Sequence, residues 1–321
     1  MKILYGINGT GNGHITKSLN IIYKLKKINN VDIDILISGD NYTIDLPLYV
    51  KYKLKGLSLI YNSEGSIDYH KTYQNLDIKK FFKDIKLSID SYDKIVTDFE
   101  PVTSWASKLN KRECIGISHQ YSFLSKKSPR PNHKSFIGEL ILKNMAPVTN
   151  PIGLHFNKYD EFILHPIIRE DIQLISSHKG DYYTVYLPSY NLNSIMNELL
   201  KYKAKFQIFT KEVNKKCLYK NLLMMPSSQS DFSKSFVSCK GVITSAGFET
   251  PSEALYLKKE LMVIPIKGQY EQMCNAESLK QLGIYVGKDI SDVSNFINNN
   301  IKIVDYNWDN PMDKIINIIL K

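Results

Sequence analysis

Short apolar runs rich in β-branched residues alternate along the chain with amphipathic stretches of helical length. The runs predict buried strands and the stretches predict helices, so the alternation indicates β-α units around a mostly parallel sheet. It occurs twice. In the first half we expect strands at Lys2–Asn8, Asp32–Ser38, Leu57–Tyr61, Lys94–Asp98 and Glu113–Ser118, and helices at His14–Ile28, Leu76–Ile89 and His133–Met145.

The second set of units follows an irregular segment, residues 146–168, that has prolines at its start and near its end. Such a segment is typical of a link between domains. Beyond it we expect strands at Tyr183–Leu187, Lys205–Thr210, Leu222–Met225, Gly241–Thr244 and Leu261–Ile264, and helices at Ser194–Leu200, Pro251–Leu257, Glu271–Leu282 and Pro311–Ile319.

The length supports this division, because 321 residues suit two domains of about 150 residues better than one large core. We expect a first domain at residues 1–150, a second at 151–310 and a terminal helix at 311–321. No apolar run approaches the roughly 18 residues of a membrane span, and the N-terminal run is too short for a secretory signal, so a cytoplasmic protein is expected. The four cysteines are scattered, which favours neither disulfides nor a zinc site.

The net charge of +10 predicts either an anionic partner or a solvated, lysine-rich surface. Only three of the 42 basic residues are arginines, and nucleic-acid recognition relies on the bidentate guanidinium, so no nucleic-acid partner is expected. The inner face of a membrane with acidic lipids is a candidate partner, which would make the protein peripheral there.

The first expected strand runs into a glycine-rich loop, Gly9-Thr10-Gly11-Asn12-Gly13-His14. A loop between a strand and a helix is where α/β sheets bind anions, so Gly11 and Gly13 are candidates for that task. The glycine spacing fits neither a P-loop nor the dinucleotide fingerprint, so neither ATP nor NAD is supported. His14 opens the helix and is a candidate general base; a solvated ring on the helix is the alternative.

Two later strands of the first half end in polar residues. Asp98 and Glu100 follow one strand, and His119 and Gln120 follow the next. The carboxyl ends of parallel strands meet at one edge of a sheet, where open α/β sheets bind ligands. Asp98 is a second candidate base, or the residue that orients His14. Glu100, His119 and Gln120 are candidates for the acceptor side, with helix capping as the alternative for the two carboxylates.

In the second half, Thr244–Ala276 predicts a strand end, a helix, a further strand and a polar helix start. Backbone N–H groups at the first turn and the dipole of the helix after it favour a diphosphate. The residues concerned are Ser245, Ala246, Gly247 and Thr250. The motif T-x-x-E from Thr250 to Glu253, with Pro251 between them, also fits a capping box that needs no ligand.

The same stretch carries a family resemblance. Gly247-Phe248-Glu249-Thr250-Pro251-Ser252-Glu253 matches in spacing the G-W-N-S-x-x-E core of UDP-glycosyltransferase signatures, and Glu271-Gln272-Met273-Cys274-Asn275-Ala276 resembles their D-Q-x-x-N-A close. The chain resembles GT-B glycosyltransferases. Within them it is similar to the bacterial enzymes related to the lipid II N-acetylglucosaminyltransferase, which carry a glycine-rich loop ending in Gly-His, as Gly9 to His14 does here.

The resemblance implies an α/β protein of the GT-B class, with two Rossmann-like domains that face a central cleft and a terminal helix that packs back on the first domain. The first domain would bind the acceptor and the second the nucleotide sugar. Glu253 would bind the ribose hydroxyls, and Glu271 with Gln272 the hydroxyls of the transferred sugar. The turn from Ser245 to Gly247, together with Thr250, would bind the diphosphate.

We therefore expect an inverting, metal-independent glycosyltransferase of the hexosyltransferase type. It would move a sugar from a nucleoside diphosphate donor, UDP favoured, to an acceptor hydroxyl on a lipid-linked or cell-envelope glycan. No D-x-D pair ends an expected strand, so neither a metal nor a cofactor besides the donor substrate is expected.

Two alternatives stay open. One is an enzyme like UDP-N-acetylglucosamine 2-epimerase, which needs no acceptor. The other is a non-catalytic protein that binds nucleotide sugars. It is suggested by Glu249, where the plant-type signature has Asn, and by Leu187-Pro188-Ser189-Tyr190, where relatives have a glycine-rich loop.

Overall fold

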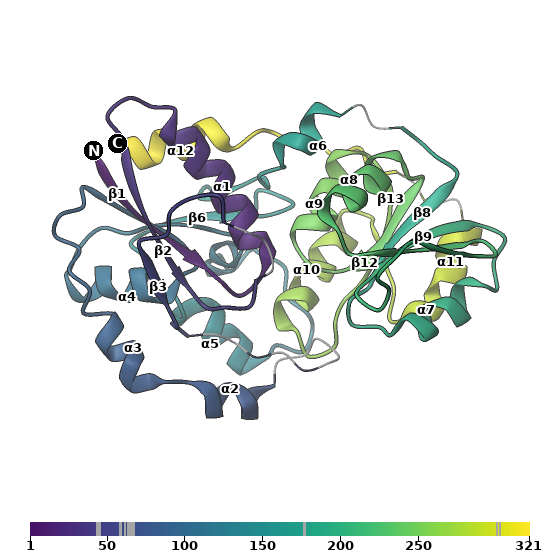
Figure 1. Ribbon diagram of the computed structural model, residues 1–321, viewed down its shortest axis with the longest axis horizontal. Helices are drawn as coiled ribbons and strands as arrows, with labels where there is room; N and C mark the ends of the chain where they lie inside the picture. The colour runs from purple at the N-terminus through teal and green to yellow at the C-terminus, as the bar shows by residue number, and fades with distance from the viewer. Residues whose placement is uncertain are drawn as a thin grey trace.

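The computed structural model describes residues 1–42, 46–57, 60, 62, 68–175, 178–299, 301 and 303–321. Within them the chain forms two lobes, each built on a seven-stranded sheet with helices packed against it (Figure 1). The α/β class and the two sets of β-α units expected from the sequence are confirmed.

The first sheet has the strand order β3-β2-β1-β4-β5-β6-β7, and its neighbouring strands are all parallel. The inner strand β1 is buried along nearly its whole length, because helices cover both faces of the sheet. The strands are β1 (Lys2–Asn8), β2 (Asp32–Ser38), β3 (Tyr52–Leu54), β4 (Lys94–Asp98), β5 (Ile115–Ser118), β6 (Asn150–Leu154) and β7 (Ile163–Leu164). The helices of this lobe are α1 (Asn12–Lys26), α2 (Tyr69–Asn75), α3 (Ile78–Asp84), α4 (Pro101–Leu109), the 3-10 helix η1 (Gln120–Leu124) and α5 (Phe136–Asn144).

The first lobe differs from the expectation in several places. Its sheet continues beyond residue 150, the expected domain boundary, because β6 pairs with β5 and β7 pairs with β6. The link to the second lobe follows β7 and contains α6 (Glu170–Leu174). Strand β3 and helices α2 and α4 were not expected. The strand expected at Leu57–Tyr61 lies mostly outside the described residues.

The second sheet has the order β10-β11-β9-β8-β12-β13-β14, parallel except for the antiparallel edge strand β10. Its strands are β8 (Tyr182–Tyr186), β9 (Lys205–Thr210), β10 (Cys217–Tyr219), β11 (Leu222–Pro226), β12 (Gly241–Ser245), β13 (Glu260–Ile264) and β14 (Tyr285–Val286). Its helices are α7 (Leu192–Leu199), α8 (Gln229–Ser238), α9 (Glu249–Tyr256), α10 (Tyr270–Gln281), the 3-10 helix η2 (Ile290–Asp292) and α11 (Val293–Asn298).

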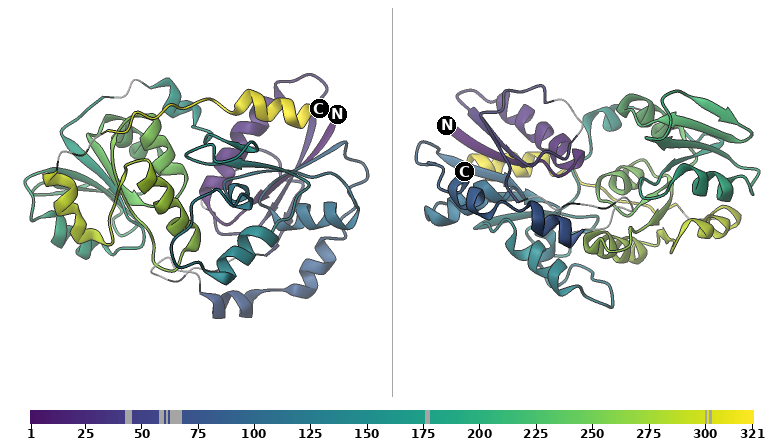
Figure 2. Two further views of the ribbon diagram at one scale, coloured as in Figure 1. Left: turned by 180° about the vertical axis from the view of Figure 1, so that it is seen from behind. Right: turned by 60° about the horizontal axis from the view of Figure 1, so that its bottom comes forward.

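The last helix, α12 (Met312–Leu320), returns to the first lobe and lies along α1 (Figures 1 and 2). Its buried residues Met312, Ile315 and Ile319 belong to the same apolar cluster as Ile15 and Leu19 of α1. This cluster also includes residues on one face of the second sheet, whereas separate clusters fill the other face of each sheet. The lobes are therefore joined by buried apolar contacts as well as by the chain.

The N-terminal ends of α1 and α9 meet where the two lobes face each other. A side-chain carbon placed on Gly13 in α1 would lie 3.1 Å from Cγ of Glu249, the first residue of α9. Each helix follows directly on the carboxyl end of a strand in its own sheet, β1 and β12. The fold thus brings together two glycine-containing turns that lie more than 200 residues apart in the sequence.

Candidate active site

His14 and Asp98 form a hydrogen-bonded pair at the edge of the first lobe. Nδ1 of His14 lies 2.9 Å from Oδ1 of Asp98, which ends β4. The His14 side chain keeps 15% of its surface exposed, whereas that of Asp98 is fully buried. With Nδ1 directed at the carboxylate, Nε2 is the ring nitrogen that this hydrogen bond leaves available.

The carboxylate of Asp98 has three partners. The ammonium of Lys17 lies 2.7 Å from Oδ1, and the hydroxyl of Ser18 donates to Oδ2 at 3.0 Å. Burial alone would raise the pKa of Asp98, but the charges of Lys17 and His14 outweigh it and lower this pKa to about 2. Asp98 is therefore ionised at neutral pH and already hydrogen-bonded, which suits an orienting group better than a proton acceptor.

The turn after β4 fixes this arrangement. Phe99 has a positive φ of 52°, and Nδ2 of Asn8 in β1 donates to its carbonyl at 3.1 Å. Glu100 then caps α4, accepting hydrogen bonds from the backbone N–H groups of Val102 at 2.7 Å and Thr103 at 2.6 Å. Glu100 is fully buried, so this candidate for the acceptor side serves as a helix cap and does not reach the cleft.

The glycine loop makes a tight, open turn between β1 and α1. Oδ1 of Asn8 accepts hydrogen bonds from both the backbone N–H and the hydroxyl of Thr10, at 3.0 and 2.7 Å. Gly11 has φ of 151°, a conformation that favours glycine, and a side-chain carbon there would meet nothing within 4 Å. The loop therefore borders open space next to His14.

The start of α9 offers a similar opening in the second lobe. The helix begins at Glu249, one residue before the expected cap at Thr250, and Phe248 in the N-cap position has no side-chain oxygen to cap it. The capping box is therefore wrong as an explanation of this motif. A side-chain carbon on Gly247 would meet nothing within 4 Å. An uncapped helix start beside open space is a favourable place for an anion.

Glu253 is paired with an arginine from the link between the lobes. Oε1 and Oε2 of Glu253 accept from Nε and Nη2 of Arg169 at 2.6 and 3.2 Å, and both side chains are largely buried. Burial raises the pKa of Glu253 above its usual value, and Arg169 opposes this shift. The pair fixes both side chains beside α9.

Glu249 adds a further carboxyl group to this region. Burial raises its pKa to about 8; the carboxylates of Glu253 and Asp98 add to the shift, and Lys17 and Arg169 oppose it. Its position against Gly13 places it between the lobes, at the point where both helices begin.

His119 bridges the two lobes. Its Nδ1 lies 2.8 Å from the carbonyl oxygen of Leu154, and its Nε2 lies 2.7 Å from Oδ1 of Asn275 in α10. Asn275 in turn donates to the carbonyl of Ala246 at 3.0 Å, and the imidazole stacks on Phe248 at 3.9 Å between ring centroids. His119 is buried, and burial lowers its pKa. It holds the turn before α9 against the first lobe.

Of the remaining predicted residues, one pair makes a contact between the lobes. Nε2 of Gln120 donates to Oε2 of Glu271 at 3.0 Å, so a residue expected on the acceptor side contacts one expected to bind the sugar. Gln272 is buried and its side chain bonds the backbone N–H of Ile266 at 3.1 Å, which fixes the loop after β13. Ser245 and Thr250 are partly exposed at the start of α9.

Sequence reasoning missed Lys17 and Arg169. Lys17 lies three residues after His14, which puts it on the same face of α1, so helical spacing was a signal for it. Arg169 lies in the irregular link, where no local pattern points to a contact with Glu253, 84 residues later.

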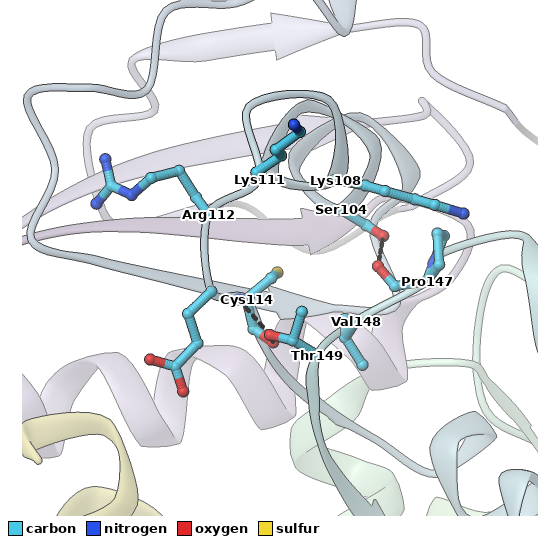
Figure 3. Close-up of a pocket in the computed structure, with 9 residues that line it drawn as sticks. Ser104, Lys108, Lys111, Arg112, Cys114, Pro147, Val148 and Thr149 are labelled. Atoms are coloured by element: carbon cyan, nitrogen blue, oxygen red, sulfur yellow. Dashed lines mark hydrogen bonds between the residues drawn. The ribbon is translucent and has the colours of Figure 1, made fainter.

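A cavity of about 630 Å³ lies elsewhere in the first lobe, beside the amino end of β5 (Figure 3). Its lining residues are Ser104, Lys108, Lys111, Arg112, Glu113, Cys114, Pro147, Val148 and Thr149. The guanidinium of Arg112 is bonded to the carbonyls of Ile89 and Tyr92, and both lysines are exposed. This cavity opens at the strand end opposite to His14 and Asp98.

The family model described as glycosyl transferase family 1 matches residues 1–301. The chain belongs to this family. It is a glycosyltransferase, as the resemblance in the sequence implied. No curated protein sequence matches the chain.

Solved structures show that this family 1 glycosyltransferase has the GT-B fold. MurG of Acinetobacter baumannii is 12% identical with a TM-score of 0.54, each chain being covered to 99%. UGT89C1 of Arabidopsis thaliana, solved with UDP, is 9% identical with a TM-score of 0.58, and SsfS6 of Streptomyces sp. SF2575 is 14% identical with a TM-score of 0.57. Both cover the chain, and are covered by it, to 100%.

Two further features concern the described residues. Among these residues, the helices are all too short or too polar to cross a bilayer. In the same part of the chain, there is no group of three or more His, Cys, Asp or Glu side chains that could hold a metal ion.

Proposed function

We propose that this glycosyltransferase inverts the anomeric carbon of a nucleoside diphosphate sugar, UDP favoured, and that His14 is its general base. The observation that carries the proposal is the His14–Asp98 hydrogen bond of 2.9 Å, with Asp98 ionised and buried behind the imidazole. A carboxylate on Nδ1 keeps that nitrogen protonated and leaves Nε2 able to accept a proton.

In the proposed reaction, Nε2 of His14 removes the proton from an acceptor hydroxyl. The hydroxyl oxygen attacks the anomeric carbon from the side opposite the diphosphate, a new C–O bond forms, and the bond to the diphosphate oxygen breaks with its electron pair. The nucleoside diphosphate leaves, and His14 releases the proton to solvent. General base catalysis of this kind contributes about 10²–10⁴-fold to the rate.

The diphosphate would bind between the glycine loop and the start of α9. Gly11, Gly13 and Gly247 leave room for phosphate oxygens, and the helix start supplies unpaired N–H donors and a positive dipole end. These groups would stabilise the leaving charge, so the proposal is metal-independent and needs no cofactor besides the donor. Glu253 would meet the ribose, and Glu271 the transferred sugar.

The acceptor would be a lipid-linked or cell-envelope glycan, bound with the first lobe against an anionic membrane surface. Exposed apolar side chains on α3 and α5 support this. Lysines stand beside them on α3, and α5 carries Lys143; both helices run along the lower side of the lobe in Figure 1. These apolar residues are Ile78, Phe82, Phe136, Ile137 and Leu140.

Flotation with phosphatidylglycerol vesicles, but not with phosphatidylcholine vesicles, is the expected result, and F136S/L140S should weaken it. Equal flotation with both lipids would contradict the membrane part.

A thermal-shift panel of UDP-, dTDP-, GDP- and CDP-sugars tests the donor assignment. A ligand that binds only the folded state raises the melting temperature with its concentration, and a UDP-sugar is expected to give the largest shift. A flat panel would contradict the proposed function. Epimerisation of the donor when it is incubated alone would favour the epimerase alternative.

A further inference from the structure

Glu249 lies at the point where the donor diphosphate is proposed to bind. A side-chain carbon placed on Gly13 would be 3.1 Å from Cγ of Glu249 and 3.7 Å from its Oε1. The acidic side chain thus extends from the first residue of α9 onto the glycine loop of the other lobe. A carboxyl group stands between the two turns that are expected to hold phosphate oxygens.

The charged groups around Glu249 do not favour the ionised form of its side chain. Lys17 on α1 and Arg169 in the link attract it, whereas Asp98 at the end of β4 and Glu253 on α9 repel it. Lys17 already pairs with Asp98 at 2.7 Å, and Arg169 with Glu253 at 2.6 Å. Asp171 also lies 3.4 Å from Nη1 of Arg169, so four carboxyl groups share these two permanent cations. Burial and these neighbours raise the pKa of Glu249 to about 8.

We propose that Glu249 sets the affinity for the donor, because its carboxyl group occupies the diphosphate subsite and must be protonated or turned aside when the donor binds. This rests on the proposed function, since it names the residue that controls that same site. A neutral carboxyl group can donate a hydrogen bond to a phosphate oxygen, but a carboxylate only accepts and repels the diphosphate. Glu249 thereby makes donor binding sensitive to pH in the slightly alkaline range.

The test is calorimetric titration of UDP, dTDP and GDP into the wild-type protein, E249Q and E113Q. Glu113 is a matched control, because it is exposed beside the cavity at the amino end of β5 and its replacement removes the same charge. With a pKa of about 8, the affinity of the wild-type protein relative to E249Q should fall about tenfold between pH 7 and pH 9. E113Q should follow the wild-type protein.

The outcomes separate this proposal from the proposed function. Equal affinity of wild type and E249Q at both pH values overturns the role of Glu249 and leaves the function standing. Absence of binding by all three proteins contradicts the proposed function and this proposal with it. E249A removes the carboxyl group without adding an amide, so it gives the same gain if the charge matters, and it keeps the test decisive should E249Q fold poorly.

Discussion

The two halves of the candidate site differ in how completely their polar groups are already paired within the protein. In the first lobe, Asp98 has a hydrogen-bonding partner on each oxygen, and its cation, Lys17, is buried beside it. In the second lobe, α9 begins without a side-chain cap and Glu249 stands in the space that a phosphate would fill. Folding alone therefore assembles the proposed base, whereas the proposed donor subsite would be completed only by its ligand.

The largest expected effect is on the reaction rate, when the proposed base His14 in the first lobe is replaced. We expect H14A to lower the rate of nucleoside diphosphate release by about 10²–10⁴-fold, while UDP affinity stays close to that of the wild-type protein. D98N should also lower the rate, because the imidazole loses its negative partner. A coupled assay for the released nucleoside diphosphate measures both.

H178A is the matched control for H14A, since His178 is exposed in the described part of the link and lies outside the proposed machinery. Its rate should equal that of the wild-type protein. An H14A variant that turns over as fast as H178A would remove His14 from the mechanism.

Removing Arg169 should have a smaller effect, which is a loss of stability at the start of the second lobe. Without the guanidinium, Glu253 is left buried with no cation at its oxygens, and loss of one partner of a buried pair costs about 3–5 kcal/mol. R169M should therefore lower the free energy of unfolding measured with urea. The double variant R169M/E253Q should recover part of the loss, because the buried charge is gone. If R169M is as stable as the wild-type protein, the pair does not organise this lobe.

The last prediction concerns Glu249 and the pH dependence of stability. The pKa of Glu249 is raised from 4.5 to about 8, so the folded state loses stability relative to the unfolded state as pH rises between these values. E249Q should thus gain on the wild-type protein in melting temperature from pH 5 to pH 8, by about 2–4 °C for each kcal/mol recovered. E113Q should show no such trend. A melting difference that is constant over this range would contradict the shifted pKa.

Much of the fold could be predicted from the sequence, because buried parallel strands show as apolar runs. The bounds of β1, β2 and β4 agree with those expected. Helix α4 was missed because Glu100, which caps it, was interpreted as a candidate at a ligand-binding edge, with helix capping only as the alternative. A carboxylate before proline is found at helix starts as well as at ligand-binding sites. Only the contacts of the carboxylate in the structure distinguish a helix cap from a ligand-binding residue.

The site was predictable where it follows from topology. His14 and Asp98 lie 84 residues apart, but both follow strands whose carboxyl ends share one edge, and the structure brings them to 2.9 Å. Pairings between lobes were not predictable. The contacts of Arg169 with Glu253 and of Gln120 with Glu271 depend on how the two lobes sit against each other, which no local pattern encodes.

The anomeric configuration of the product tests the central claim most directly. Purified protein would be incubated with an α-linked UDP-sugar and a lipid extract as the source of acceptor, and the product's anomeric proton coupling would be measured by NMR. A β-linked glycoside formed together with UDP is the predicted result, since attack opposite the diphosphate inverts the anomeric carbon. An α-linked glycoside, or an epimerised sugar still attached to UDP, would contradict the account.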